Sequence, residues 1–370
     1  MEVNDNLRLI ILDNCKEFGQ KVNDNINDIM KNSEYKNYIV PVSVPRFSNG
    51  EGKGVLLESI RGKDVYIISD VGNHSCTYEM HGYINHMSPD DHYQDIKRVI
   101  GAIMGHAKSI MVAMPLLYES RQHKRKGRES LDCAIMLQEL IHAGAKGVIT
   151  FDAHHPGVNN AIPYNTFDNI YPTNMILNNF IDSEDIDFRK LLVISPDKGA
   201  MSRARYNADM LRSDVGLFYK RRDYSKIVDG KNPIVAHDYL GKDVKGLNAL
   251  IVDDMIASGE TMLDVARRLK ERGAENIYIS VTFALFTEGI EEFRKAYEQG
   301  LFYKVYTTNL SHINEEFKKE EWLNIVDCSR LLAKYIYTVN QKQSTENLAN
   351  GKQKILKKLE EKDTNFHIND

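Results

Sequence analysis

Residues 249–269 read ALIVDDMIASGETMLDVARRL, and this stretch decides how the chain is expected to fold. It opens with a short apolar run, 250–252, that is partly β-branched, as in a strand buried on both faces of a parallel sheet. Apolar residues then recur at helical spacing: Met262, Val265, Ala266 and Leu269. Gly273 stands where the C-terminus of such a helix is expected. The stretch therefore predicts a strand, a loop and an amphipathic helix.

The loop between the two elements, IASGE, is suited to an anion. Its small residues let a ligand approach backbone N–H groups at the positive end of the helix, which favours phosphate. Asp253 and Asp254 would repel a bare polyphosphate, whereas a sugar phosphate brings hydroxyl donors that carboxylates accept. We therefore expect the acids to hold a sugar and the loop its phosphate. A strand-to-helix turn with exposed acids is the alternative from this stretch alone.

The same pattern of apolar run, loop and helical segment recurs along the chain. Further predicted strands are LRLIIL (7–12), DVYIISD (64–70), SIMVAMP (109–115), GVITFD (147–152), LLVISPD (191–197) and NIYISVTFAL (276–285). This alternation predicts the α/β class. Ligands of parallel α/β sheets lie outside the carboxyl ends of the strands, where Asp152 and Asp197 are also expected. Several acids at strand ends indicate a polar, metal-assisted site.

Length and composition set the broad class. A chain of 370 residues is long enough for two domains, and 42% hydrophobic with 27% charged residues is ordinary for a globular protein. The net charge of −4 and pI near 6.3 give no overall positive field. We therefore expect neither nucleic acid nor an anionic membrane as a partner.

The cysteines and the N-terminus indicate the compartment. Four widely spaced cysteines form neither a CxxC pair nor a disulfide framework: Cys15, Cys76, Cys133 and Cys328. The start, MEVNDNLRLI, lacks a basic segment followed by an apolar core, and no apolar run is long enough to span a bilayer. These features predict a cytoplasmic protein that is neither exported nor inserted in a membrane.

Two segments interrupt the pattern. Residues 165–175, NTFDNIYPTNM, carry a proline and turn-prone residues and are the expected domain junction. From about residue 350 the sequence GKQKILKKLEEKDTNFHIND is strongly charged and poor in core residues. It is expected to be a frayed helix or disordered.

Six motifs together resemble a known family. They are FSNGEGKGVLLESIRGKDVYII (47–68), SRQHKRKGRES (120–130), GVITFDAHH (147–155), VISPDKGAMSRAR (193–205), GLFYKRR (216–222) and LIVDDMIASGETM (250–262). Their order and approximate spacing resemble the ribose-phosphate pyrophosphokinases over residues 7–348. The last motif alone also marks type I phosphoribosyltransferases, so the ordered set carries the resemblance.

The resemblance implies a fold and a reaction. It implies two phosphoribosyltransferase-type, Rossmann-like domains, 1–168 and 169–321, with a C-terminal helix at 322–348 completing the first and a charged tail at 349–370. The implied reaction moves the pyrophosphoryl group of MgATP to the 1-hydroxyl of ribose 5-phosphate, giving phosphoribosyl pyrophosphate and AMP. The family also implies a homo-oligomer, a hexamer or a dimer-based assembly, in which neighbouring subunits share ATP sites.

The resemblance also implies roles for residues in the C-terminal half. Asp253 and Asp254 would bind the ribose hydroxyls. The 5-phosphate would lie in the loop formed by Ala257, Ser258, Gly259, Glu260 and Thr261. Lys220 and Arg222 match a catalytic pair on a mobile loop that would close over the transferring group and neutralise its charge. A solvated basic turn is the alternative for these two residues.

The ATP site is implied by residues of the N-terminal half. Arg121 and Gln122 match the family's ATP-binding pair, and Arg suits a phosphate or a stacked base. Phe47, Asn49 and Glu51 match a loop that reaches the adenine pocket of the next subunit. His154 matches an ATP-binding and magnesium position, and Asp197 matches a second magnesium position. Mg²⁺ is the one cofactor implied, and a His contact to it would pass through water or reach ATP directly.

The sequence also departs from the family. Asn49 replaces an Asp, Ala161 an acid and Glu260 a Gly, while Lys198 and Ala200 alter the usual SPD-x-G-G. These departures fit an active enzyme or a non-catalytic regulatory paralogue, and a type I phosphoribosyltransferase is a further alternative. His155 has no expected role. Four histidines around an apparent insertion fit no zinc pattern and are expected at the surface: His74, His81, His86 and His92.

Overall fold

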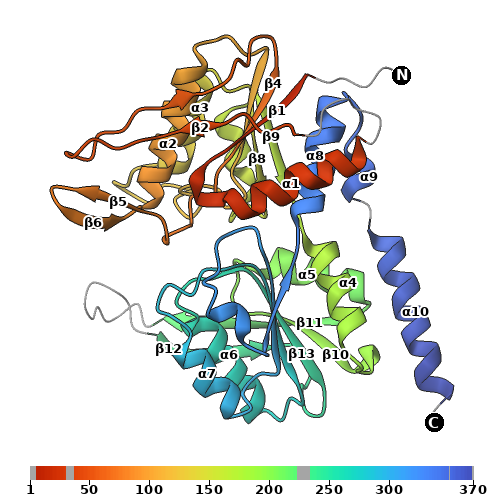
Figure 1. Ribbon diagram of the computed structural model, residues 1–370. Helices are drawn as coiled ribbons and strands as arrows, with labels where there is room; N and C mark the ends of the chain where they lie inside the picture. The colour runs from red at the N-terminus through yellow and green to blue at the C-terminus, as the bar shows by residue number, and fades with distance from the viewer. Residues whose placement is uncertain (1–5, 31–36, 223–233, 350, 369–370) are drawn as a thin grey trace. The chain divides into compact units, whose positions relative to one another are not determined.

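The computed structural model describes residues 6–30, 37–222, 234–349 and 351–368; for 220–222, 234–237, 347, 349 and 363–368 it describes the backbone only. The chain divides into two compact units. Unit 1 comprises Met1–Pro172, Asn309–Asn314 and Asp327–Asn350, and unit 2 comprises Thr173–Thr308, Glu315–Val326 and Gly351–Asp370. Both are α/β structures built on mostly parallel sheets, as the sequence predicted (Figure 1).

Unit 1 is built on a parallel sheet in the order β1-β4-β7-β8-β9. The strands are β1 (Leu7–Ile11), β4 (Asp64–Ile68), β7 (Ser109–Ala113), β8 (Gly147–Phe151) and β9 (Thr166–Ile170). The first four are strands that the apolar runs predicted. The fifth was missed, because β9 lies in the stretch expected to be a junction. Its alternating polar sequence, TFDNI, lacks the apolar run of a central strand, as suits an edge position.

Helices cover both faces of this sheet. Val65 and Ile67 of β4 share one core with α2 (Pro89–Ile103) and α3 (Asp132–His142). Side chains alternate across a strand, so Tyr66 points to the other face. There α8 (Ser329–Asn340) brings Tyr335 close to Tyr66 and to Asp168 of β9, and α1 (Lys16–Ile29) packs beside α8.

Two small antiparallel sheets complete unit 1. One pairs β2 (Val42–Ser43) with β3 (Val55–Leu56), and the other pairs β5 (Thr77–Met80) with β6 (Tyr83–His86). The short helices are η1 (Asp13–Cys15), η2 (Pro156–Ala161) and α9 (Glu346–Ala349).

Unit 2 is built on a larger sheet in the order β12-β11-β10-β13-β14-β15-β16, parallel except for the β11–β12 pair. The strands are β10 (Leu191–Ser195), β11 (Asp214–Arg222), β12 (Ile234–Leu240), β13 (Asn248–Ile256), β14 (Ile277–Ala284), β15 (Lys304–Thr308) and β16 (Leu323–Val326). The predicted strands of this half are confirmed as β10, β13 and β14. β13 is longer than predicted, since it continues through Asp253 and Asp254.

The helices of unit 2 lie on both sides of its sheet. α4 (Thr173–Ser183) places Phe180 against Tyr278 of β14 and Tyr306 of β15, at ring distances of 5.1 and 5.2 Å. α5 (Met201–Leu211) packs on β10 and β13. The predicted helix after the acids is confirmed as α6 (Glu260–Glu271), which packs on β13 and β14, and α7 (Glu291–Glu298) follows. The remaining short helices are η3 (Phe188–Lys190) and η4 (Phe317–Lys319).

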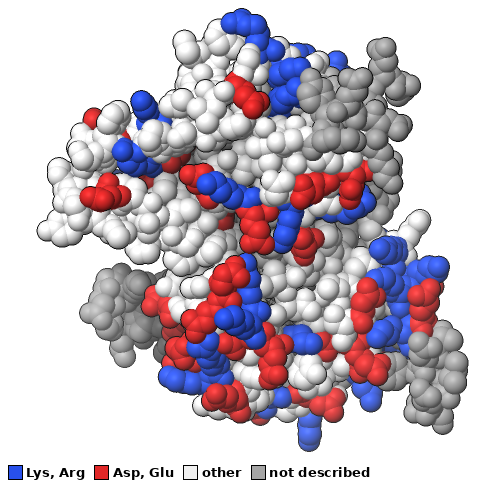
Figure 2. Space-filling view, viewed as in Figure 1, with Lys and Arg blue, Asp and Glu red and all other residues white. Residues whose placement is uncertain are grey.

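The exposed faces of α6 and α7 carry charges of both signs. Figure 2 shows acidic and basic side chains interspersed over this part of unit 2. Several are paired, such as Arg268 with Asp264 at 3.1 Å and Lys295 with Glu292 at 2.7 Å. The pattern is that of amphipathic helices with a solvated outer face.

The charged end of the chain is more structured than its composition suggested. Residues Lys352–Ile368 form α10, which packs on α4 and α5. Ile355 and Leu359 are buried, and Lys358 pairs with Asp182. The apolar residues are few, but their spacing of four places them on one helix face. In the described ranges of the chain, every helix is too short or too polar to cross a bilayer.

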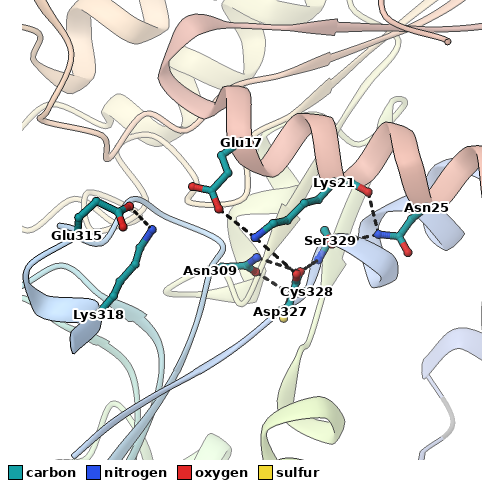
Figure 3. Close-up of polar contacts among 9 residues, drawn as sticks. All are labelled: Glu17, Lys21, Asn25, Asn309, Glu315, Lys318, Asp327, Cys328 and Ser329. Carbon is teal, nitrogen blue, oxygen red and sulfur yellow. Dashed lines mark hydrogen bonds and ion pairs between the residues drawn. The ribbon is translucent and has the colours of Figure 1, made fainter. Parts of the chain in front are cut away.

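The segment around Asp327 fixes the start of α8 to α1 (Figure 3). The Asp327 carboxylate accepts hydrogen bonds from the Ser329 N–H at 2.8 Å and from the Asn309 amide at 2.9 Å, and Lys21 lies 3.9 Å away. Asn25 of α1 donates to the Ser329 hydroxyl at 3.2 Å. Burial alone would raise the pKa of Asp327, but the hydrogen bonds from Ser329 and Asn309 and the charge of Lys21 outweigh it and lower the pKa.

One expectation about the histidines was wrong. His92 is only 1% exposed, because it lies in the first turn of α2 and its ring Nε2 is 2.7 Å from the Asn73 carbonyl oxygen. Burial lowers its pKa. His74, His81 and His86 are exposed, as predicted.

Candidate active site

The acid pair lies within the last residues of β13. Asp254 is buried, with 2% of its surface exposed, and Asp253 is half-buried. The Asp253 carboxylate accepts the Asp254 N–H at 2.9 Å, and the Arg203 guanidinium of α5 lies 3.9 Å from the Asp254 carboxylate. Burial raises the pKa of Asp253 well above its usual value, and the charges of Asp254 and Asp197 raise it further. A cation or hydroxyl donors bound here would relieve this repulsion.

The predicted phosphate loop joins β13 to α6 directly. Gly259 is the N-cap of α6 and has a φ of 86°, the left-handed region that favours glycine. A Cβ atom at Gly259 would lie 2.2 Å from the Phe293 ring, so glycine is required for space as well. Ser258 and Glu260 are exposed and Thr261 is half-buried. The N-terminus of a helix presents N–H groups that favour phosphate, and the N-terminus of α6 lies in this loop.

An aromatic core lies beneath this loop. Phe293 of α7 is buried and stacks on Trp322, with ring centroids 5.8 Å apart and an interplanar angle of 18°. Phe286 packs edge-on to Phe293 at 5.2 Å. The Thr287 N–H donates to the Ala257 carbonyl at 3.0 Å. The loop therefore packs on the Phe293 ring at Gly259, and a backbone hydrogen bond from Thr287 holds it at Ala257.

Asp197 follows β10, the strand next to β13. Its carboxylate accepts the N–H groups of Gly199 at 2.7 Å and Ala200 at 3.1 Å, which orders the turn into α5. Because β10 and β13 are parallel neighbours, Asp197 and the acid pair lie at the same edge of the sheet. Unit 2 therefore gathers three carboxylates and the phosphate loop at one edge.

Lys220 and Arg222, expected on a mobile loop, instead lie in the last residues of β11. The backbone of Lys220 pairs with His237 of β12, and an irregularity lies between Arg221 and Arg222. Their side chains lie outside the described part of the chain. β11 runs parallel to β10 and passes its carboxyl end, which puts both residues at the edge that carries Asp197.

The Phe47–Glu51 segment forms a tight loop of unit 1. Arg46 and Gly52 form an antiparallel bridge at its base, and the Phe47 N–H donates to the Glu51 carbonyl at 2.6 Å. Asn49 donates its amide to the Glu51 carboxylate at 2.8 Å, which an Asp at this position could not do when ionised. The Phe47 side chain is 52% exposed.

The Arg121–Gln122 segment and His154 belong to the loops after β7 and β8. Arg121 is exposed, whereas Gln122 donates to the Ser130 carbonyl at 2.8 Å. His154 is half-buried and follows Asp152, which is buried with a φ of 37°. Such strained backbone at the end of a parallel strand is common where ligands bind.

His123 is the residue here that sequence reasoning missed. Its ring stacks on His155 at 4.7 Å and lies 5.4 Å from the His154 ring, so it joins the two loops. Burial lowers its pKa, and the charges of His155 and His154 lower it further. Its position beside Gln122 was the only signal in the sequence.

Some of the side chains at the ends of the strands carry donor atoms that suit a hard cation such as Mg²⁺. In unit 2, Asp197, Asp253 and Asp254 offer carboxylate oxygens, the ligands that Mg²⁺ prefers. In unit 1, His154 offers a ring nitrogen. Among the residues that the structure describes, no three His, Cys, Asp or Glu side chains form a ready metal cage.

A parallel strand with two acids near its end, followed by a glycine-capped helix, is the arrangement expected of a phosphoribosyltransferase-type protein. Residues 174–317 match the phosphoribosyl transferase domain, and residues 7–144 match the N-terminal domain of ribose phosphate pyrophosphokinase. The chain belongs to the ribose-phosphate pyrophosphokinase family.

Individual relatives are similar in sequence to this chain over most of its length. The ribose-phosphate pyrophosphokinase of Synechococcus elongatus is 29% identical over 311 residues, which are 83% of this chain and 86% of the relative. That of Staphylococcus saprophyticus is 27% identical over 304 residues, covering 82% and 87%. The crystal structure of phosphoribosylpyrophosphate synthetase from Mycobacterium smegmatis has a TM-score of 0.73 at 22% identity and covers 91% of this chain and 100% of that one. This last similarity shows a shared fold.

Proposed function

We propose that the protein is a ribose-phosphate diphosphokinase, which transfers the pyrophosphoryl group of MgATP to the 1-hydroxyl of ribose 5-phosphate and releases AMP. The observation that carries the proposal is the joining of Asp253 and Asp254 to a glycine-capped helix start in a chain whose two halves match both domains of the family. A type I phosphoribosyltransferase would not account for the match over residues 7–144.

Ribose 5-phosphate is assigned to unit 2. The backbone of Ala257–Thr261 and the hydroxyls of Ser258 and Thr261 would hold the 5-phosphate. The carboxylates of Asp253 and Asp254 would accept hydrogen bonds from the ribose hydroxyls. The raised pKa of Asp253 supports this division, because a crowded carboxylate gains most from a donor.

ATP is assigned to residues of unit 1: Phe47, Asn49, Glu51, Arg121, Gln122 and His154. The exposed ring of Phe47 offers a flat apolar surface to a base, and the exposed Arg121 guanidinium offers a fork to phosphate. Both side chains are thus accessible to a nucleotide.

His154 and Asp197 are the proposed magnesium residues. The bound ion would neutralise phosphate charge and polarise the transferred group. Lys220 and Arg222 are the proposed catalytic residues, which would stabilise charge on the transferring group. Asp197 also holds the turn before α5 through the N–H groups of Gly199 and Ala200, so its loss would disturb that turn as well.

The proposed assembly is a homo-oligomer, a hexamer or a dimer-based form, in which neighbours share ATP sites and which lies in the cytoplasm. The exposed Phe47 and four free cysteines, three of them buried, are compatible with it. Light scattering after gel filtration would give the subunit number, and a monomer would contradict the assembly.

The deciding experiment supplies ATP, Mg²⁺ and ribose 5-phosphate and separates AMP from ADP by chromatography. AMP that forms only when the sugar is present supports the proposal. ADP would indicate transfer of a single phosphoryl group. If the pure protein forms neither AMP nor ADP, a non-catalytic regulatory paralogue is favoured. The departures from the family at Glu260 and Ala161 are compatible with that alternative.

Lys220→Ala tests the catalytic assignment. If Lys220 acts mainly on the transition state, kcat should fall by about 100-fold or more with a much smaller change in KM. Steady-state kinetics of AMP formation give both values. A kcat within a few-fold of wild type would remove Lys220 from the mechanism.

A further inference from the structure

The β5–β6 hairpin stands apart from both large sheets. It pairs only with itself in the described part of the chain, and its strands are joined by His81 and Gly82, both with positive φ, as in a type I′ turn. Figure 1 shows it at the margin of unit 1. A two-stranded hairpin is marginally stable by itself, so contacts elsewhere must hold it in place.

Those contacts go to the Phe47–Glu51 loop. The His81 N–H at the hairpin turn donates to the Ser48 carbonyl at 2.8 Å. The Met80 sulfur lies so close to Gly50 that a Cβ atom there would be 2.6 Å away, and the Tyr78 ring lies next to it. Gly50 has a φ of 91°, so the turn of the loop depends on the residue that the hairpin covers.

The base of the Phe47–Glu51 loop is held by an ion pair with α2. Arg46 forms a two-pronged ion pair with Asp95 of α2, with both N–O distances at 2.8 Å, and both side chains are buried. The Tyr78 ring lies 5.3 Å from the Arg46 guanidinium carbon. Arg46 is thus held between a helix of the core and the hairpin.

The two faces of the hairpin differ. Tyr78 and Met80 lie on the face toward the loop and are half-buried. Glu79 and its cross-strand partner Ile84 lie on the opposite face, and Ile84 is 76% exposed. The hairpin therefore provides matched positions, one in contact with the loop and one turned away from it.

We propose that the β5–β6 hairpin is a positioning element for the nucleotide loop, with Met80 and the His81 amide fixing Ser48 and Gly50 so that Phe47 and Glu51 are presented to ATP. The inference rests on the proposed function, since it takes the Phe47–Glu51 loop as part of the ATP site. It adds residues 77–86, which lie within the apparent insertion at 73–92, to the groups that determine ATP affinity.

The test compares Met80→Ala with Ile84→Ala in the full-length chain. A loosened loop must be ordered when ATP binds, so Met80→Ala should raise KM for ATP by about five- to tenfold. Its KM for ribose 5-phosphate and its kcat should change less than about twofold, and Ile84→Ala should leave all three values near wild type. A purely structural role would not separate the two KM values.

A second variant replaces Thr77–His86 by two glycines. The ends lie close together, because the Met87 N–H donates to the Cys76 carbonyl at 2.8 Å. This variant should raise KM for ATP by at least the factor found for Met80→Ala, again without a matching rise for ribose 5-phosphate. Unchanged KM for ATP in both variants, or equal rises for both substrates, would overturn the inference.

Calorimetric titration of ATP, without the sugar, separates this inference from the proposed function. If the wild type forms no AMP, the proposed function fails, yet weaker ATP binding by Met80→Ala than by Ile84→Ala would still support the hairpin's role. If the wild type forms AMP and the two variants bind ATP equally well, the hairpin's role fails alone.

Discussion

The proposed phosphate loop of unit 2 and the proposed nucleotide loop of unit 1 each contain a glycine with positive φ, but they are supported differently. Gly259 caps a helix directly above a buried aromatic core. Gly50 lies in a turn supported by the flexible end of Met80. We therefore expect the loop that packs on the core to be the more rigid of the two, and the loop that packs on the hairpin to adjust more easily.

Gly259→Ala should have the largest effect. The left-handed backbone costs about 1–2 kcal/mol for a residue with a Cβ atom, and displacing the buried Phe293 ring adds about 1–3 kcal/mol. We expect kcat/KM for ribose 5-phosphate to fall by at least about 100-fold, with ATP binding retained. Kinetics with each substrate varied in turn measure this. A fall in kcat/KM of less than about tenfold would mean that the Phe293 ring moves aside easily. The supports of Gly259 and Gly50 would then not differ in rigidity.

Asp70 of unit 1 extends the comparison to a buried acid. Burial raises the pKa of Asp70 to about 6, although the His312 N–H, the Gly72 N–H and the Ser311 hydroxyl donate to it. The folded state then binds more protons than the unfolded state between the usual pKa of 3.8 and about 6, so stability falls as pH rises through this window.

Asp70→Asn should remove that dependence on pH. Between pH 7 and pH 4 the wild type should gain roughly 2 kcal/mol of unfolding free energy relative to the variant. Urea unfolding at several pH values measures it, with the exposed Asp13→Asn as control. Parallel pH profiles for wild type and Asp70→Asn would show that Asp70 is not the responsible group.

Gly50→Ala is the matched partner of Gly259→Ala. The backbone strain is the same, but the Met80 side chain can move aside, so KM for ATP should rise only about tenfold. An effect as large as that of Gly259→Ala would show that the hairpin is as rigid a support as the core.

Glu260→Gln should have the smallest effect. Glu260 is exposed in the first turn of α6, where a carboxylate is mildly favourable to the helix, by about 0.3–1 kcal/mol. We expect KM for ribose 5-phosphate to change less than about fivefold. A much larger fall in KM would show that the carboxylate faces the phosphate and weakens the site.

The two loops also differ in how well the sequence predicts them. The strand, acids, glycine and helix of the phosphate loop follow one another along the chain, so local patterns predicted all four, and only the end of β13 was misplaced. The nucleotide loop could be placed by resemblance, but its support could not, because Met80 and Asp95 reach it across the fold. His123 and His92 were missed for the same reason: their environments are made by segments that are distant in sequence. β9 was missed because an edge strand needs no apolar run.

The aromatic core under the phosphate loop has a spectroscopic consequence. Trp322 is the chain's single tryptophan, is 1% exposed, and stacks on the ring that supports Gly259. All indole emission therefore originates a few side chains from the proposed 5-phosphate position, and none from unit 1. We therefore expect tryptophan fluorescence to change when a ligand binds at the proposed phosphate loop, and to change less when one binds at the Phe47–Glu51 loop, because unit 1 has no tryptophan.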